Sequence, residues 1–273
     1  MIGRRAVIGL SLLSALLFCA LAAQSAFAAK SINTTMFTCV KGQGKIDFKD
    51  AHCDEKVATG AEYGHVEIPL NTTTEIHATN KKVTNETKDH EPAVLKSKVG
   101  LVKTEITCTD VTVTHEKTLF HNIETEKKHT LTGVAVVDYK ECKVVQPEKC
   151  TVKEPIVAEA TVEGVEELGA AKNEMGQEFK GSGAEETFAE ITFEGAECSL
   201  KGKTFKVKGS AIGTSGPTTE SSQTNKWGGA TLVFTPKNNM QKLKLGVETA
   251  EFTNIVTPTM GTTGDPISTT TFT

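Results

Sequence analysis

The sequence predicts an all-β protein, built as an antiparallel β-sandwich or barrel and stapled by disulfide bonds. Short segments that alternate apolar and polar residues recur along the chain, and glycine-rich or polar turns separate them. Threonine is concentrated in these segments, which suits half-exposed pleated strands. An even set of cysteines follows an apparent export signal and supplies the disulfides.

The chain opens with features of a signal peptide. A basic start and a charge-free apolar run over residues 6–23 precede Ala26 and Ala28, which place small residues where a signal peptidase reads. No stop-transfer pattern follows the apolar run. We therefore expect residues 1–28 to be removed, leaving a mature chain without an integral membrane segment that is secreted or held at the cell surface.

Seven cysteines occur, and Cys19 lies inside the expected signal peptide. Lipidation of Cys19 is disfavoured because the bulky Phe18 precedes it. The other six form an even set, typical of disulfides in an oxidising compartment. These six are Cys39, Cys53, Cys108, Cys142, Cys150 and Cys198.

Distance along the chain predicts how the six cysteines pair, because short loops close most readily. The predicted pairs are Cys39–Cys53, Cys142–Cys150 and Cys108–Cys198. The first pair flanks a hairpin and the second flanks the loop 143–149. No two of the six have Cys-x-x-Cys spacing and no histidine pair accompanies them, so we expect neither a metal site nor a cofactor.

The charge balance argues against nucleic-acid partners. Of the 30 basic residues, two are Arg4 and Arg5 in the expected signal peptide, which leaves 28 lysines against 34 acidic residues and a net formal charge of −6. Arginine is the residue suited to bidentate recognition of phosphate, and the mature chain has none. An acidic domain of this kind has no electrostatic footprint for nucleic acid or anionic lipid.

Residues 29–92 form the first predicted unit, an N-terminal β segment that is either separate or part of one domain with residues 93–256. Its strands are expected at 36–40, 45–48, 63–70 and 73–78. Gly42-Gln43-Gly44 is a turn signal between the first two strands. The polar stretch 80–92 has no periodicity and is either a linker or a long exposed loop.

Residues 93–256 form the main predicted sandwich or barrel domain. Apolar residues alternate from Val102 to Cys108 and resume after a slip at Asp110, which suggests a β-bulge. The run 131–145 is apolar on both faces around 134–137, so this strand is expected to be central.

Further strands are expected at 156–162, 187–193, 203–212, 231–235 and 243–247. Residues 165–178 could hold a short helix, which Gly169 and Gly176 weaken. The Thr-, Gly- and Pro-rich residues 257–273 are expected to be a frayed tail.

Four segments carry a resemblance: the Cys108 strand, 141–150, 188–194 and 209–213. Together they resemble secreted β-rich proteins of unassigned function found in soil actinobacteria. The resemblance spans most of residues 39–213. It implies export, a β fold and disulfides, and it supplies no activity and no catalytic residue.

Paired carboxylates are the obvious enzymatic candidates, because glycosidases need two about 5 to 9.5 Å apart. Glu190 and Glu194 share one strand face, which places their backbones roughly 13 Å apart. The alternation with Ala189, Ile191 and Phe193 instead predicts an exposed polar face opposite an apolar one.

Histidines give no catalytic constellation. His65 could be oriented by Glu67 as a general base, yet no activated nucleophile can be placed beside them. His90 and His115 each begin an HExxH-like motif but lack its second histidine. We therefore expect His65, His90 and His115 to be ordinary surface residues.

Trp227, the only tryptophan, stands beside two glycines before the strand 231–235. It is expected to seal one end of the core, with stacking on a sugar or peptide ring as the alternative, so it is the one candidate ligand contact.

Together these observations predict a secreted, non-catalytic β protein that works as a binding module or as part of the cell exterior, with a cell-surface or extracellular polymer as its candidate partner. One alternative is an extracellular glycosidase-like hydrolase, which requires a cleft with two carboxylates. Another is a barrel that holds a small apolar ligand, which requires an enclosed apolar cavity.

Overall fold

The computed structural model describes residues 30–31, 34–53, 55–78, 80, 91–113, 115–125, 128–166, 175–215, 219–220, 225–227, 230–236 and 242–272. The predicted signal peptide, residues 1–28, lies outside them, as do residues 81–90 of the expected linker. The described chain is nearly all β and includes a short 3-10 turn, η2 (His115–Lys117). No helix in this described part is long and apolar enough to cross a membrane. The predicted all-β class is confirmed.

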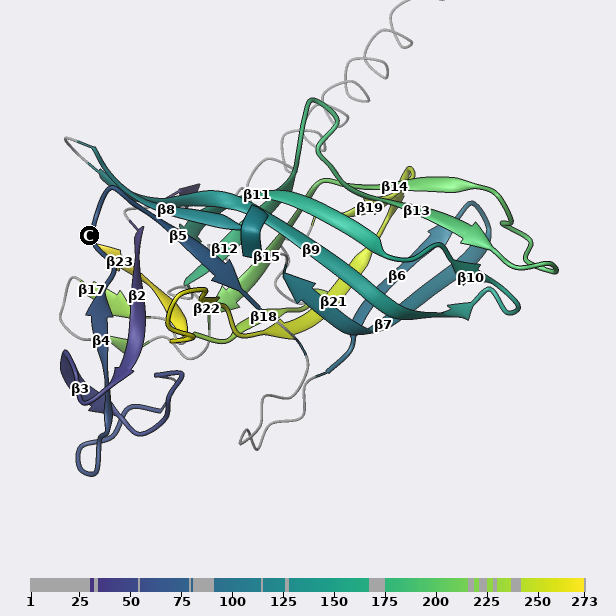
Figure 1. Cartoon of the computed structure of the whole chain (residues 1–273). Coiled ribbons are helices and arrows are strands. Elements are labelled where there is room, and N and C mark those ends of the chain that lie inside the picture. The colour runs from purple at the N-terminus through teal and green to yellow at the C-terminus, as the bar shows by residue number, and fades with distance from the viewer. Residues whose placement is uncertain are drawn as a thin grey trace, which may run out of the picture.

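Eight antiparallel strands close into a barrel (Figure 1). In order around the wall they are β6 (Ala93–Val99), β7 (Val102–Val113), β9 (Lys128–Gln146), β11 (Ile156–Glu166), β12 (Met175–Gly181), β15 (Ser210–Ser215), β18 (Leu232–Phe234) and β21 (Glu251–Val256). The wall closes because β21 pairs back onto β6. Closure gives each of these eight strands a neighbour on both sides, so none of them is an edge strand of the barrel.

Outer strands extend the barrel wall. They are β1 (Lys30–Ser31), β5 (Thr72–His77), β8 (Leu119–Thr125), β10 (Thr151–Val152), β13 (Thr187–Glu194), β14 (Thr204–Lys208), β19 (Lys244–Leu245), β20 (Glu248–Thr249) and β22 (Thr259–Met260). The 19-residue β9 pairs with β8 through its first half, with β7 through its second, and with β11 on its other side. Its predicted central position is confirmed.

A second sheet joins the two ends of the chain. Its order is β16 (Thr219–Glu220), β17 (Asn225–Trp227), β23 (Ile267–Phe272), β2 (Thr34–Lys41), β4 (Tyr63–Glu67) and β3 (Lys45–Phe48). Residues 257–273, expected to be a frayed tail, instead contribute β23, which pairs with β2 and buries Ile267. Residues 29–92 are likewise divided between the sheets, because β5 pairs with β8 in the barrel wall. Proximity of the chain ends in space accounts for the first difference, and the pairing of β5 with β8 accounts for the second. Sequence patterns encode neither contact.

The expected slip at Asp110 is real, but it is not a one-sided bulge. Cys108 and Val111 are both buried although they lie three residues apart. The inward-facing residues of β7 are therefore even-numbered before the slip and odd-numbered after it. The partner strand β9 shows the same change of inward-facing residues at Glu141, whose φ is 52°. Both strands therefore kink together, and their register is the same on either side of the kink. The carboxylate of Glu154 stabilises the kink by accepting hydrogen bonds from the backbone N–H groups of Glu141 and Cys142, at 2.9 and 2.7 Å.

Two other segment predictions are wrong in detail. The expected strand 203–212 is two strands, β14 and β15, divided at Gly209, whose φ is 107°. A Cβ there would lie 2.0 Å from the carbonyl oxygen of Lys242, so the break requires glycine. The expected helix at 165–178 begins inside β11 and ends inside β12, and residues 167–174 lie outside the described part.

All six predicted cysteines form disulfides, but two of the three predicted pairs are wrong. The bonds are Cys39–Cys53, Cys108–Cys142 and Cys150–Cys198. Cys108 and Cys142 are direct register partners across β7 and β9, with Cα atoms 4.0 Å apart. The pairing of the neighbouring strands β7 and β9 therefore determines the partner of Cys142, and the short loop to Cys150 does not. Three disulfides indicate an oxidising environment.

Candidate functional site

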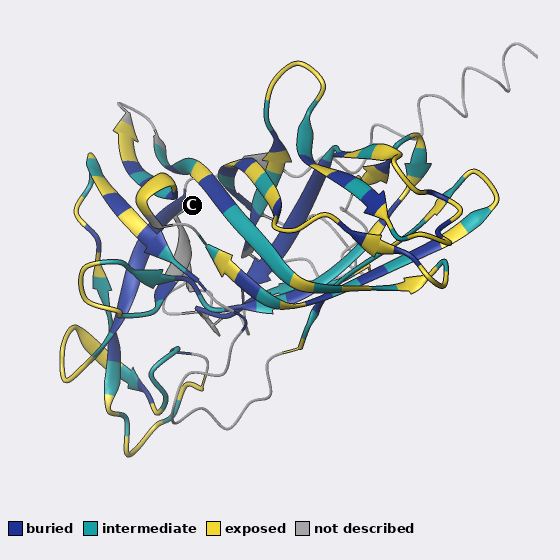
Figure 2. Ribbon diagram, turned by 45° about the vertical axis from the view of Figure 1, so that its right-hand side comes forward, coloured by how far each residue is buried: buried dark blue, intermediate teal, exposed yellow. Residues whose placement is uncertain are grey.

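An apolar cavity of about 150 Å³ lies inside the barrel. Its walls are the inward side chains of the barrel strands, together with residues from β5, β8, β13 and β14. Figure 2 shows buried and less buried residues alternating along these strands. In a barrel, this alternation places every second side chain in the interior. Several lining residues, among them Leu95, Val137 and Tyr139, are only partly buried although they point to the interior, because they border the open space.

Small side chains leave part of the barrel interior unfilled. Seven lining residues are alanines: Ala78, Ala93, Ala135, Ala158, Ala160, Ala189 and Ala211. Ala158 faces Ala189 across β11 and β13, and it keeps more accessible surface than the other six. The largest unfilled space in the wall is therefore expected in front of Ala158.

A chain of edge-to-face aromatic rings forms one side of the cavity. Phe179 and Phe234 have ring centroids 5.4 Å apart, Phe234 and Phe252 are 5.6 Å apart, and Phe252 and Tyr139 are 6.3 Å apart. Such contacts are favourable beyond the area they bury and hold the rings in fixed orientations. The cavity therefore has a preformed aromatic wall that ends at Tyr139.

Four polar side chains interrupt the apolar lining: Thr118, Tyr139, Gln177 and Asn254. None of the described lining residues is acidic, basic or histidine. Burial raises the pKa of the Tyr139 hydroxyl well above its ordinary value. The cavity is thus an uncharged, largely apolar space in which few groups can orient a ligand.

A second hollow, of about 410 Å³, is an open groove on the outside of β8, β9, β11 and β12. Glu163 and Glu178 line it as direct register partners, with His121 and Lys180 nearby in the groove. Sequence reasoning missed this carboxylate pair because the two residues lie on different strands. Both are half-buried, and like charges directly opposite each other weaken strand pairing.

The carboxylates singled out in the sequence lie apart from both hollows. Glu190 and Glu194 are exposed on β13, while Ala189, Ile191 and Phe193 are buried on its other face. The predicted polar face is confirmed. Glu190 lies opposite Lys206 on β14.

His65 is not the ordinary surface histidine that the sequence suggested. It lies on β4 between Phe48, with ring centroids 4.6 Å apart, and Phe37, 6.1 Å away. Burial lowers its pKa to about 4, against a smaller opposing effect of Asp47. A histidine so depressed is neutral at neutral pH and packs as part of an aromatic cluster.

We expect this burial to make stability depend on pH. The unfolded chain, with a His65 pKa near 6.5, binds more protons than the folded chain above pH 4, so the free energy of unfolding falls as the pH drops through this window. The expected loss through His65 is about 2 kcal/mol between pH 7 and pH 5. Urea unfolding of the wild type and of His65→Gln across this range measures it; equal slopes for the two proteins would contradict the prediction.

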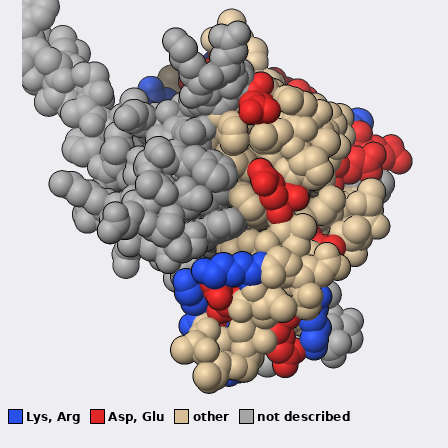
Figure 3. Space-filling view, turned by 90° about the vertical axis from the view of Figure 1, so that its left-hand side faces the viewer, with Lys and Arg blue, Asp and Glu red and all other residues tan. Residues whose placement is uncertain are grey.

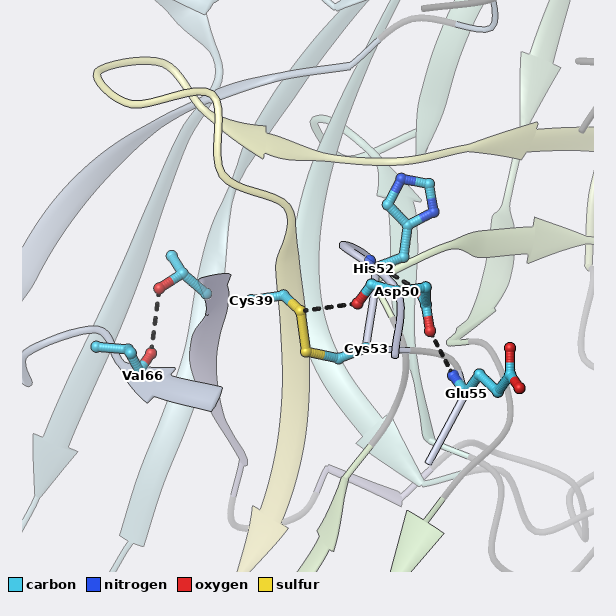
Figure 4. The surroundings of a disulfide bond; sticks show 7 residues. Cys39, Asp50, His52, Cys53, Glu55 and Val66 are labelled. Carbon is cyan, nitrogen blue, oxygen red and sulfur yellow. Dashed lines mark hydrogen bonds between the residues drawn. A yellow bond between two sulfur atoms is a disulfide. The ribbon is translucent and has the colours of Figure 1, made fainter. Parts of the chain in front are cut away.

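Beside this cluster, the Cys39–Cys53 disulfide closes a compact loop (Figure 4). The Asp50 carboxylate accepts hydrogen bonds from the backbone N–H groups of His52 and Glu55, at 2.9 and 2.6 Å. These bonds hold the backbone of His52 and Glu55 next to Asp50. The carboxylate of Asp50 therefore stabilises the local backbone, since both of its oxygens accept hydrogen bonds from it.

The remaining predicted site residues are only partly described. Trp227 belongs to β17, but its side chain lies outside the described part, as does that of His115 in η2; all of His90 lies outside it. Trp227 therefore stays a candidate ligand contact. The described residues contain no group of three or more potential ligands that could hold a metal ion.

Surface charges are mixed. In the described part of the face drawn in Figure 3, lysines lie beside acidic side chains. The ion pairs include Lys41–Glu62, Lys45–Asp47, Lys96–Glu105 and Lys180–Glu186. Such a surface offers no obvious single-sign field for steering a charged partner.

Comparison with protein-family models, curated proteins and solved structures finds no match for this chain. The resemblance to secreted actinobacterial proteins thus stays a prediction.

Proposed function

We propose that this protein is an exported, non-catalytic carrier that binds a small apolar molecule inside its barrel. The observation that carries the proposal is the apolar cavity of about 150 Å³ inside the eight-strand barrel. Apolar cavities of this size stay dry and bind benzene-sized molecules. The three disulfides support export, because they need an oxidising compartment.

Energetics support a bound molecule. An empty apolar cavity of this volume costs roughly 3 to 4 kcal/mol of stability. Replacing some of the seven alanines by larger residues would recover part of that free energy. A ligand that fills the space offsets the cost, which gives the alanines a reason to remain small.

The hydrolase alternative is less well supported. A general acid gains its raised pKa from a site that removes water, as when a carboxyl lies in an apolar pocket. The groove that holds Glu163 and Glu178 lies on the outside of the barrel wall, and the cavity inside the barrel has no carboxylate among its described lining residues. Binding therefore suits the geometry better than hydrolysis.

Filling the cavity tests the proposal. We expect wild-type protein to bind toluene and to melt at a higher temperature in its presence. Ala158→Leu places three more carbons in the space and should weaken toluene binding about tenfold or more, without loss of the fold. Titration calorimetry and thermal melts measure both effects.

The matched control is Val157→Leu, because Val157 precedes Ala158 on β11 and is 47% exposed on the outside. It should bind toluene as the wild type does. Absence of toluene binding by the wild type, or equal binding by Ala158→Leu, would contradict the assignment of the cavity as a binding site.

A further inference from the structure

Tyr139 differs from Thr118 and Asn254, two other polar residues of the cavity wall, whose side chains already form hydrogen bonds. The Thr118 hydroxyl accepts a hydrogen bond from the Val136 N–H at 2.9 Å and donates to the Val136 carbonyl at 3.3 Å. The Asn254 side-chain oxygen accepts from the Ile255 N–H at 2.9 Å. Among the described residues, none forms a hydrogen bond with the Tyr139 hydroxyl.

The position of Tyr139 follows from the alternation of β9. Ala135, Val137 and Tyr139 take successive inward positions and line the cavity. On either side its backbone pairs with Val111 of β7 and Ile156 of β11, and its ring packs against Phe252. The ring is thus held by three strands, and Tyr139 lines the cavity.

A buried hydroxyl without a partner reduces stability, so a partner for it is favoured. Water is a poor one, since an internal water needs two to four polar contacts and this wall is largely apolar. Burial also keeps the phenol protonated, so the group remains a donor at physiological pH. A ligand oxygen placed against Tyr139 would satisfy it.

We propose that the molecule held in the barrel is an uncharged, mostly apolar compound with one carbonyl oxygen, which accepts a hydrogen bond from the Tyr139 hydroxyl. This inference rests on the proposed binding function. The ligand is uncharged because no described lining residue could neutralise an ionised group, and burying an unpaired charge is far more costly than burying a carbonyl. The aromatic wall formed by Phe179, Phe234 and Phe252 contacts its apolar part.

Two probes of the same shape test the hydrogen bond: acetophenone, and α-methylstyrene, in which a methylene group replaces the carbonyl oxygen. Dissociation constants are measured for both with the wild type and with Tyr139→Phe. Because the two probes have the same shape, the contribution of shape to binding cancels in the ratio of their dissociation constants. We expect the preference for acetophenone to be roughly two- to tenfold larger in the wild type than in Tyr139→Phe.

The matched control is Tyr63→Phe, since Tyr63 is the only other tyrosine and lies on β4, away from the cavity. It should keep the wild-type ratio. Infrared spectra give a second readout, because the carbonyl stretch of bound acetophenone should lie at lower frequency in the wild type than in Tyr139→Phe. Without ligand, Tyr139→Phe should melt no lower than the wild type.

The outcomes separate the two proposals. If both probes bind but the ratio is the same in wild type and Tyr139→Phe, the cavity binds ligands and the role of Tyr139 is refuted. If Tyr139→Phe loses both probes equally, the residue shapes the wall and donates no hydrogen bond to the ligand. If neither probe binds the wild type, the binding function itself is refuted, and with it the inference about Tyr139.

Discussion

The double variant Cys150→Ala/Cys198→Ala should lose about 4 kcal/mol of its free energy of unfolding. This bond closes a loop of 48 residues, the longest of the three, so its removal releases the most conformational entropy in the unfolded chain. It also ties the start of β10 to the turn after β13, two elements that pair at Thr151 and Glu194. Urea unfolding of the variant and the wild type measures the loss.

The comparison variant is Cys39→Ala/Cys53→Ala. Its loop spans only 14 residues, so the expected loss is smaller, about 3 kcal/mol. A larger loss for this variant than for Cys150→Ala/Cys198→Ala would contradict the loop-length explanation.

Peptide mapping under non-reducing conditions checks the pairing itself. Cleavage after lysine separates the four relevant cysteines into the fragments 104–117, 141–143, 150–153 and 181–201. We expect the first two fragments to be linked to each other, and likewise the last two. A linked 141–143 and 150–153 pair would refute this pairing and restore the one based on chain distance.

The second large effect is expected at Asn122, which fastens the second sheet to the barrel. Its fully buried side chain donates to the Ile68 carbonyl at 2.8 Å and to the Thr35 hydroxyl at 3.3 Å, and it accepts from the Met36 N–H at 3.3 Å. Asn122→Ala removes these bonds and leaves buried backbone groups unpaired. The expected loss is about 3 kcal/mol of the free energy of unfolding.

Glu124→Ala is the control for this variant, because Glu124 is exposed two residues further along β8. Its free energy of unfolding should stay within about 0.5 kcal/mol of the wild type. If Asn122→Ala is as stable as this control, the amide of Asn122 is not what joins β8 to β2.

Local patterns were sufficient to find most strands. Period-2 alternation located β3 at its observed bounds and identified the exposed face of β13, because side-chain direction along a strand depends only on its neighbours in sequence. The candidate site was less accessible, since Tyr139 gives no signal that distinguishes it from any inward-facing tyrosine.

The sequence by itself determined the all-β class, the six disulfide cysteines and the Cys39–Cys53 bridge, because each depends on residue type or on contacts between neighbours in the chain. Only the tertiary structure decided the Cys108–Cys142 and Cys150–Cys198 bridges, the pairing of β23 with β2, and the cavity inside the barrel. These features arise where strands distant in sequence meet as the barrel closes. Strand register and the volume left between opposite walls then set them, and neither quantity is a property of any local segment.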